Sequence, residues 1–207
     1  MSLYKYYFEV SPSLSKMSDK VIKSPEKSED IYRRIISVAI NKLHHISQKK
    51  SIGGYALAIL ESNLEFQSSP SVRVQSKIRV YTKKKSSLDH LLSVLKSENL
   101  FHNIYNISDV HSVPEPSQGY FAFIRVRMPT KRKQEKSYDI KQRMISLDPD
   151  CNFIYLMPSS SIKGNKRLIR YYYKCVEMEL LKTAKFSKPD GYGFSRTNRL
   201  CVVDIIN

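Results

Sequence analysis

The chain has 207 residues, which is long enough for one large or two small packed domains with a hydrophobic core. Its 35 Lys and Arg residues outnumber 19 Asp and Glu residues, which gives a formal net charge of +16 and favours a polyanionic partner, nucleic acid above all. No apolar run reaches the roughly 20 residues that a membrane span needs. The first ten residues alternate like a strand, unlike the core of a signal peptide. The sequence therefore predicts a soluble, cytoplasmic protein without a membrane partner.

The first elements are a strand, a loop and a helix. Residues 4–10 alternate like a strand, and the stretch 11–27 is rich in Ser, Lys and Pro, which is typical of a loop. Ser28 is placed to cap the helix that follows, because Glu29 and Asp30 in the first turn complement the helix dipole. The apolar stripe of this helix is expected at Ile31, Ile35, Val38, Ala39, Leu43 and Ile46.

Two strands, a second helix and a weaker strand come next. The strands are expected at 51–60 and 72–81, and the weaker one at 104–113. The second helix has Ser86 or Ser87 as its cap and Leu88, Leu91, Leu92 and Leu95 as its buried stripe. The order strand, helix, strand, strand, helix, strand is that of the split βαβ, ferredoxin-like fold. We therefore expect a ferredoxin-like domain over residues 1–116.

The second half of the chain has shorter and less regular patterns. Strands are expected at 120–128, 152–157 and 168–179, with a basic segment at 130–147 between the first two. Together they predict a smaller, irregular, basic α+β lobe over residues 117–207. The expected fold class of the whole chain is α+β.

Positive charge is concentrated in this second half. Between Tyr120 and Lys174, thirteen Lys and Arg residues stand against four Asp and Glu residues. A short charge run is usually a solvated face. This cluster extends over a strand, a helix candidate and a Gly-containing loop, which favours a groove that follows phosphates. The basic candidates for RNA binding are Arg125, Arg127, Lys131, Arg132, Lys133, Lys136, Lys141, Arg143, Lys166 and Arg167.

The strand expected at 120–128 has two different faces. The core-facing positions are Tyr120, Ala122, Ile124, Val126 and Met128, and the opposite positions are Phe121, Phe123, Arg125 and Arg127. Exposed Phe rings can stack on bases, and Arg side chains can read guanine edges. We therefore interpret the second face as an RNA-binding surface. The alternative is that a neighbouring helix covers the two Phe rings.

Histidines and two hydroxyl-bearing segments are the candidates for chemistry. His44 and His45 lie near the end of the first helix, where the dipole favours a protonated imidazole, and either one is a candidate base. Tyr192 lies between two glycines that let the backbone approach a ligand, although such turns are usually structural. The serine run that begins at Ser159 adds hydroxyl groups beside basic residues, and by itself it is a polar turn.

Metal chemistry is not expected. Cys151, Cys175 and Cys201 are widely spaced, and none lies in a Cys-x-x-Cys or Cys/His cluster. They are most simply interpreted as buried thiols. The sequence therefore predicts neither a metal nor a cofactor.

In order and approximate spacing, these motifs resemble the CRISPR-associated endoribonuclease of type I-F systems, which cuts the repeat hairpins of precursor CRISPR RNA. Residues 37–44 are similar to the helix that carries the catalytic histidine of that family. Residues 113–114 and 120–127 are similar to the strand that leads into its RNA-binding lobe. Residues 153–161 are similar to its serine-bearing strand and turn, and residues 192–195 to its C-terminal Tyr-Gly-Leu-Ser signature.

The resemblance implies a role for each matching residue. His44 would be the general base for the attacking ribose 2′-hydroxyl, Tyr192 would pack near it and orient it, and Ser159 would hold the ribose. Arg125 and Arg127 would read bases at the foot of the hairpin. The residues that would lie along the stem are Lys131, Arg132, Lys133, Lys136, Lys141 and Arg143.

Three departures from the family pattern are visible. Pro158 occupies the position of the family serine in a gap-free alignment, so Ser159 requires a shift of one residue. Arg127 stands where the family often has glutamine, which changes the expected base from adenine to guanine. The basic segment is shorter and richer in lysine, which favours point contacts over bidentate ones.

The activity implied is a metal-independent transesterification that cuts the repeat hairpin in an antiviral defence system. The protein would then stay on the 3′ hairpin with the other subunits of the type I-F surveillance complex. One alternative is a catalytically impaired hairpin-binding subunit of such a complex, including a transposon-associated one with a transposition adaptor protein as partner. Another is a generic structural RNA-binding protein.

Overall fold

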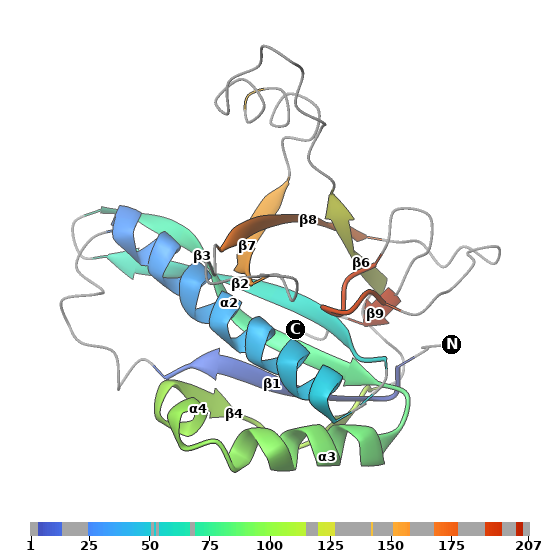
Figure 1. Cartoon of the computed structure of the whole chain (residues 1–207). Coiled ribbons are helices and arrows are strands. Elements are labelled where there is room, and N and C mark those ends of the chain that lie inside the picture. The colour runs from blue at the N-terminus through green and yellow to red at the C-terminus, as the bar shows by residue number, and fades with distance from the viewer. Residues whose placement is uncertain are drawn as a thin grey trace, which may run out of the picture.

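The computed structural model describes residues 4–13, 25–50, 52, 54–66, 69–114, 120–126, 142, 151–157, 168–177, 189–195 and 202–204. The described residues form two antiparallel sheets and three helices. The long helix α2 crosses in front of the first sheet and beneath the second (Figure 1). Among the described residues, no helix combines the length and the apolar character that a membrane crossing requires.

The first sheet has the ferredoxin-like topology that the sequence predicts. Its order is β2 (Ala56–Phe66), β3 (Ser69–Thr82), β1 (Tyr6–Pro12) and β4 (Tyr105–Ile107), and β5 (His111–Ser112) also pairs with β1. Helices α2 (Pro25–Lys49) and α3 (Lys85–Lys96) contact each other and pack on β1 and β3. One strand–helix–strand unit begins with β1 and continues through α2 to β2, and another begins with β3 and continues through α3 to β4, so the expected fold class is confirmed.

The region expected to be one weak strand at 104–113 is instead divided. Helix α4 (Asn99–Ile104) precedes β4, and β5 follows after a short irregular segment. The leucine stripe of α3 is confirmed, because Leu88, Leu91, Leu92 and Leu95 are all buried. Its expected serine cap is wrong: the cap residue is Lys84, and it makes no side-chain capping bond.

Helix α2 differs from the sequence prediction in its start and in its buried face. It begins at Pro25, where the fixed φ and missing N–H of proline suit a first turn, and Ser28 lies within it. Val38, expected in the core, is 55% exposed. The buried apolar positions are Tyr32, Ile36, Ala39, Ile40, Leu43 and Ile46. The stripe shifts because α2 packs on the first sheet with one side and on a strand of the second sheet with another.

The second sheet consists of β7 (Asn152–Leu156), β8 (Ile169–Glu177), β6 (Tyr120–Val126) and β9 (Val202–Asp204), in this order. Strands β6, β7 and β8 were expected, and β9 was not. Side chains of both sheets belong to one continuous hydrophobic core. The contributions of the second sheet include Phe123, Ile154, Leu156, Tyr171, Tyr173 and Val203.

The face of β6 that was expected to bind RNA packs inward at its Phe residues, whereas Arg125 on the same face is exposed. Phe123 is only 2% exposed, and its ring lies 6.3 Å from that of Tyr173. Phe121 is half-buried against the same core. Both Phe residues line a cavity together with residues 59–61 of β2 in the first sheet, and β2 contacts β6. The prediction that Phe123 stacks on bases is therefore wrong. The alternative, that a neighbouring helix covers the ring, is replaced by cover from the first sheet.

The cysteines also differ from expectation. Cys151 is half-buried and Cys175 is exposed, so the prediction of buried thiols is wrong for Cys175, while Cys201 lies outside the described residues. Although Cys175 is exposed as a residue, its thiol is partly desolvated by its neighbours, and this desolvation, with the nearby Glu61 carboxylate, raises its pKa to about 11. The thiol therefore stays protonated at neutral pH and is a poor nucleophile.

Candidate active site

His44 meets the segment 189–195 at the C-terminal half of α2. Its ring is half-buried, and Nδ1 lies 2.5 Å from the carbonyl oxygen of Gly191. A carbonyl oxygen only accepts, so Nδ1 carries the hydrogen and donates it. In the neutral imidazole the other nitrogen, Nε2, then keeps its lone pair. The contact therefore selects the neutral tautomer in which Nε2 can accept a proton, which is what a general base requires.

Tyr192 covers one face of the His44 ring. The two ring centroids are 4.0 Å apart with an interplanar angle of 28°. The Tyr192 hydroxyl donates to the carbonyl oxygen of Met157 (2.9 Å). Burial and the nearby Asp190 carboxylate raise the pKa of Tyr192, and the positive charge of Arg125 offsets part of that rise. Tyr192 is thus a protonated donor at neutral pH whose ring stacks on that of His44.

The conformation of the 189–195 segment is set largely by Asp190. Its Oδ1 accepts from the backbone N–H groups of Tyr192 (2.9 Å) and Phe194 (3.0 Å), and its Oδ2 accepts from the Tyr171 hydroxyl. Gly193 has a φ of +88°, a backbone conformation that residues other than glycine rarely adopt. The turn around Tyr192 is therefore held from within by one carboxylate.

The two glycines beside Tyr192 bring the segment close to its neighbours. A Cβ on Gly191 would lie 3.1 Å from Cε1 of His44. A Cβ on Gly193 would lie 2.8 Å from Cγ of Leu57. The sequence predicts that these glycines let the backbone approach a ligand. In the structure they let it approach the His44 ring and β2.

The same segment joins the two sheets. The N–H of Leu57 in β2 donates to the Gly193 carbonyl oxygen (2.9 Å), and the N–H of Ser195 donates to the Phe123 carbonyl oxygen in β6 (2.8 Å). The Arg125 N–H donates back to the Ser195 carbonyl oxygen (2.9 Å). The turn that carries Tyr192 is therefore fixed to both sheets.

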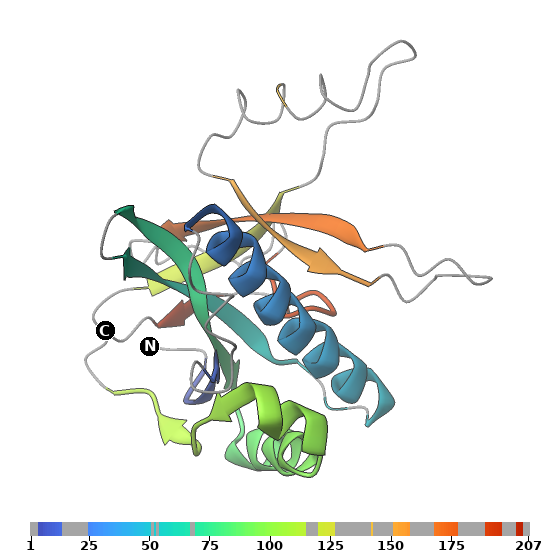
Figure 2. The same ribbon diagram turned by 90° about the vertical axis from the view of Figure 1, so that its left-hand side faces the viewer.

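Strand β7 reaches the site along the side of α2, as the two ribbon views show (Figures 1 and 2). Its free edge is hydrogen-bonded by side chains of the helix. Nδ2 of Asn41 donates to the Tyr155 carbonyl oxygen (2.9 Å), and Oδ1 of Asn41 accepts from the Met157 N–H (2.8 Å). One turn earlier, the Ser37 Oγ accepts from the Tyr155 N–H (2.8 Å). Asn41 thus pairs with β7 as a neighbouring strand would.

The peptide groups of Met157 are consequently held on both sides next to His44. Asn41 binds the N–H, and Tyr192 binds the carbonyl oxygen. Sequence reasoning did not identify Asn41 as a functional residue. Its position three residues before His44 puts it on the same side of α2, which was the one signal available.

Of the sequence-predicted site residues, the structure brings together His44 and Tyr192. His45 is exposed. Arg125 is also exposed, and its guanidinium carbon lies 4.8 Å from the ring centroid of Tyr171, which neighbours Tyr192. Residues outside the described part of the chain are Ser159, Arg127, Lys131, Arg132, Lys133, Lys136, Lys141, Arg143, Lys166 and Arg167.

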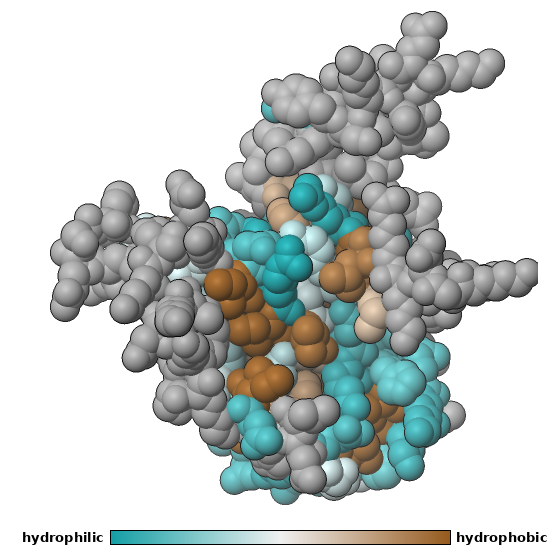
Figure 3. Space-filling view, turned by 60° about the vertical axis from the view of Figure 1, so that its left-hand side comes forward, coloured by the Kyte–Doolittle hydropathy of each residue, from teal (hydrophilic) through white to brown (hydrophobic). Residues whose placement is uncertain are grey.

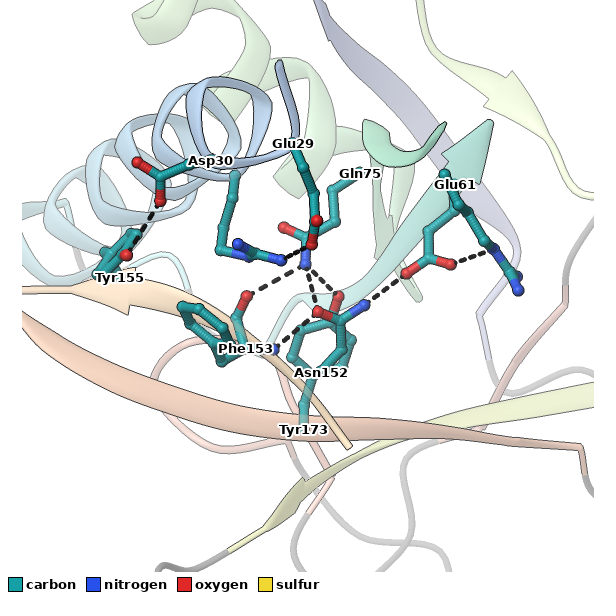
Figure 4. Close-up of polar contacts among 10 residues, drawn as sticks. Glu29, Asp30, Glu61, Gln75, Asn152, Phe153, Tyr155 and Tyr173 are labelled. Atoms are coloured by element: carbon teal, nitrogen blue, oxygen red, sulfur yellow. Dashed lines mark hydrogen bonds and ion pairs between the residues drawn. The ribbon is translucent and has the colours of Figure 1, made fainter. Parts of the chain in front are cut away.

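A second polar cluster lies at the other end of β7 (Figure 4). The side-chain nitrogen of Gln75, which carries two hydrogens, lies within hydrogen-bonding distance of three acceptors: Asn152 Oδ1 (3.1 Å), the Phe153 carbonyl oxygen (3.1 Å) and the Tyr173 hydroxyl (3.0 Å). Asn152 in turn donates to Glu61 (2.6 Å). We call Gln75, Asn152, Tyr173 and Glu61 the docking cluster, because it links β2 and β3 to β7 and β8.

Comparison with known proteins adds only remote structural matches. No protein-family model matches the chain, and no curated protein matches it. A solved RAMP protein described as binding different RNA substrates is 11% identical, with 97% of this chain and 100% of that chain covered and a TM-score of 0.40. A CRISPR-associated protein, Cas6, is 11% identical, with 98% and 99% covered and a TM-score of 0.35.

A third structure, a chlorite dismutase from Candidatus Nitrospira defluvii, is also 11% identical, with 84% of this chain and 78% of that chain covered and a TM-score of 0.26. All three TM-scores are low, so the fold assignment rests on the strand order of the first sheet.

Proposed function

We propose that the protein is a metal-independent endoribonuclease that binds and cleaves CRISPR repeat hairpins in precursor crRNA. In this proposal it stays bound to the 3′ hairpin as a subunit of a type I-F surveillance complex. The observation that supports it most is the His44 contact, in which Nδ1–H is bound to Gly191 and Nε2 is left as a base beside Tyr192. His44 and Gly191 lie 147 positions apart in the chain and are in contact in the structure.

The chemistry follows from the free Nε2. It takes the proton of the ribose 2′-hydroxyl, and the 2′-oxygen attacks the adjacent phosphorus. The bond from phosphorus to the 5′-oxygen breaks, and the leaving oxygen receives a proton from the imidazolium or from water. The products are a 2′,3′-cyclic phosphate and a 5′-hydroxyl. We assign the holding of the ribose to Ser159, which follows the anchored Met157 by two residues.

Binding of the hairpin is assigned to the basic residues of the second half. Arg125 and Arg127 are proposed to read bases at the foot of the stem, because Arg suits the guanine edge. Contacts with phosphates along the stem are proposed for Lys131, Arg132, Lys133, Lys136, Lys141, Arg143, Lys166 and Arg167. Phe123 is left out because it is buried.

A second candidate is a hairpin-binding subunit with impaired catalysis, in a type I-F complex that can include a transposition adaptor protein. Pro158 favours it, because this residue occupies the position of the family serine. A generic structural RNA-binding protein is the third candidate. It differs from the other two in having no preference for one hairpin.

A cleavage assay in EDTA on the repeat hairpin of the CRISPR array nearest the gene separates the three. We expect one cut at the foot of the stem, with a cyclic phosphate and a 5′-hydroxyl end. A hairpin with a 2′-deoxyribose at the cut position is the control and should bind uncut. Tight, selective binding without a cut supports the impaired subunit, and binding without hairpin preference supports the structural protein.

A further inference from the structure

The outer face of β7 and β8 is lined by aromatic rings. Ile154 and Leu156 point into the core, so the intervening side chains of β7 point outward. These are Phe153 and Tyr155, which lie opposite Tyr172 and Arg170 of β8. The rings of Phe153 and Tyr155 meet edge to face at 5.5 Å, and Phe153 lies 5.7 Å from Tyr172. Phe153 and Tyr155 are only half-buried.

Arginine side chains lie on these rings. The guanidinium carbon of Arg170 is 5.0 Å from the Phe153 ring centroid, and that of Arg34 is 5.0 Å from the Tyr155 centroid. Arg33 approaches Phe153 to 4.1 Å from the helix side. Stacking on a ring fixes the plane of a guanidinium before a ligand arrives, while its N–H groups stay available.

Two of the three arginines have acidic partners. Glu29 pairs with Arg33, and Asp30 pairs with Arg34 (2.6 Å) and accepts from the Tyr155 hydroxyl (3.1 Å). The Arg34 side chain nevertheless remains 56% exposed. No ion pair within the described part of the chain involves Arg170. The Arg170 side chain hydrogen-bonds instead to Tyr172 and Tyr155. A polyanion would therefore reach Arg170 without displacing a carboxylate, and would compete with the Asp30 carboxylate for Arg34.

Exposed apolar side chains continue this surface. Val38 on α2 is 55% exposed, Met157 at the end of β7 is 45% exposed, and Leu168 before β8 is 46% exposed. Apolar groups lie beside hydrophilic ones on the face of the molecule that carries α2 (Figure 3). We call the set Arg34, Val38, Tyr155, Met157, Leu168 and Arg170 the arginine–aromatic strip.

The strip leads to the candidate active site. Arg34 precedes His44 by ten residues in α2, which corresponds to about 15 Å along the helix axis. At its other end, Met157 is bonded through its N–H to Asn41 and through its carbonyl oxygen to Tyr192. A nucleic acid strand on the strip therefore reaches His44 after about four nucleotides, at roughly 3.4 Å per stacked nucleotide.

We propose that the strip binds a single-stranded RNA segment that flanks the hairpin beside the cleaved phosphate. Unpaired bases offer faces that stack on rings and guanidinium planes, whereas paired bases in a stem do not. The exposed apolar side chains suit base faces, and the arginines suit the phosphates between them. The net charge of +16 supports a polyanion as the occupant. This inference rests on the proposed function and extends it from the hairpin to its flank.

The test measures the affinity of the intact protein for hairpins without a tail, with a 5′ tail and with a 3′ tail of about eight nucleotides, twice the estimated reach. In the parent, one of the two tails should tighten binding about tenfold, the value expected for one or two stacked bases. In the double variant Arg34→Ala, Arg170→Ala the ratio of tailed to tail-less affinity should fall to about one. Circular dichroism establishes that the variant is folded.

Two controls keep the result specific. The double variant Lys83→Ala, Lys85→Ala removes the same charge from the junction of β3 and α3, and should keep the tail ratio of the parent. The double variant Arg34→Lys, Arg170→Lys keeps the charge but loses planar stacking, so it should lose part of the ratio. Pairing the tail with a complementary strand should abolish the gain.

A parent that gains nothing from either tail overturns the inference, as does a gain that survives in the double alanine variant or on a paired tail. Each of these results leaves hairpin cleavage intact and the proposed function standing. If no hairpin binds, the proposed function fails. Single-stranded RNA alone then tests the strip, and equal binding by the parent and by Arg34→Ala, Arg170→Ala contradicts it.

Discussion

The two polar clusters along β7 use their hydrogen-bonding groups differently. In the docking cluster, the side-chain nitrogen of the buried Gln75 is fully engaged with acceptors of the second sheet. In the candidate active site, the half-buried His44 donates from Nδ1–H to the Gly191 carbonyl oxygen. Its Nε2 makes no hydrogen bond within the described residues. The first cluster uses both N–H groups of the Gln75 amide within the protein and leaves the buried Gln75 Oε1 unpaired among the described atoms. The second keeps its open acceptor, His44 Nε2, on a half-buried ring.

The difference separates structure from chemistry. A buried amide that loses its partners is costly, so the docking cluster fixes where the second sheet sits. An imidazole held by one nitrogen has its tautomer and direction fixed while the other nitrogen can still take a proton. Substitutions at the two ends of β7 should therefore have opposite consequences for stability and for cleavage.

The largest effect is expected for the histidine. Removal of a general base costs about 10² to 10⁴-fold in rate, so His44→Ala should nearly abolish single-turnover cleavage in EDTA with hairpin affinity little changed. His45→Ala is the matched control, since His45 is exposed and should cut at a rate close to the parent. Unimpaired cleavage by the His44 variant, or loss only in the His45 variant, contradicts the assignment.

Asn41→Ala should slow cleavage by about ten- to a hundredfold, because loss of the clamp on Met157 lets β7 and Tyr192 shift relative to His44. Ser37→Ala is the control: it removes a hydrogen bond to the same strand one turn farther from His44. Comparison of single-turnover rate with affinity distinguishes positioning from binding. Equal rates for the two variants mean that Asn41 serves only to dock the strand.

Gln75→Ala should lower the free energy of unfolding by about 1–3 kcal/mol, because it leaves buried acceptors of the docking cluster unpaired. Its single-turnover cleavage rate at a temperature where it is folded should match that of the parent. Ser76→Ala on the same strand is the control and should unfold like the parent. A cleavage defect in folded Gln75→Ala would show that the two clusters are not independent.

Tyr192→Phe keeps the ring on His44 but loses the hydrogen bond to Met157, so we expect a rate lower by about three- to tenfold. Burial raises the pKa of Tyr192 above its ordinary value near 10. The hydroxyl is therefore protonated below about pH 10, and the ratio of parent to variant rates should be constant from acid to mildly alkaline pH. A ratio that varies across this range indicates another role for the phenol.

Much of the fold follows from the sequence because periodicity reports which positions are buried. The leucines of α3 and the order of elements in the first sheet are of this kind. Phe123 in β6 was assigned wrongly because alternation identifies two faces without saying what covers each, and its ring packs toward the first sheet. The prediction that Val38 is buried is wrong for a related reason, because the packing of β7 against α2 shifts the buried face of the helix.

The residues of the candidate site likewise include some that the sequence predicts and some that it does not. His44 and Tyr192 were identified through a family resemblance, which carries spatial information that periodicity lacks. Asn41 was missed because its partners in β7 are backbone groups far away in the sequence. Gln75 was missed because its partners, one of them a backbone carbonyl, are more than 70 residues away. A backbone carbonyl or N–H leaves no mark on the sequence of either partner, so these contacts are visible only in three dimensions.

The most direct test of the central claim is the tautomer of His44. Proton–nitrogen correlation NMR of the histidine rings, recorded where the imidazoles are neutral and assigned by comparison with His44→Ala, identifies which nitrogen carries the hydrogen. The geometry predicts a hydrogen on Nδ1 and an unprotonated Nε2. A hydrogen on Nε2 would contradict the claim, because the nitrogen assigned to take the proton of the 2′-hydroxyl would already hold one.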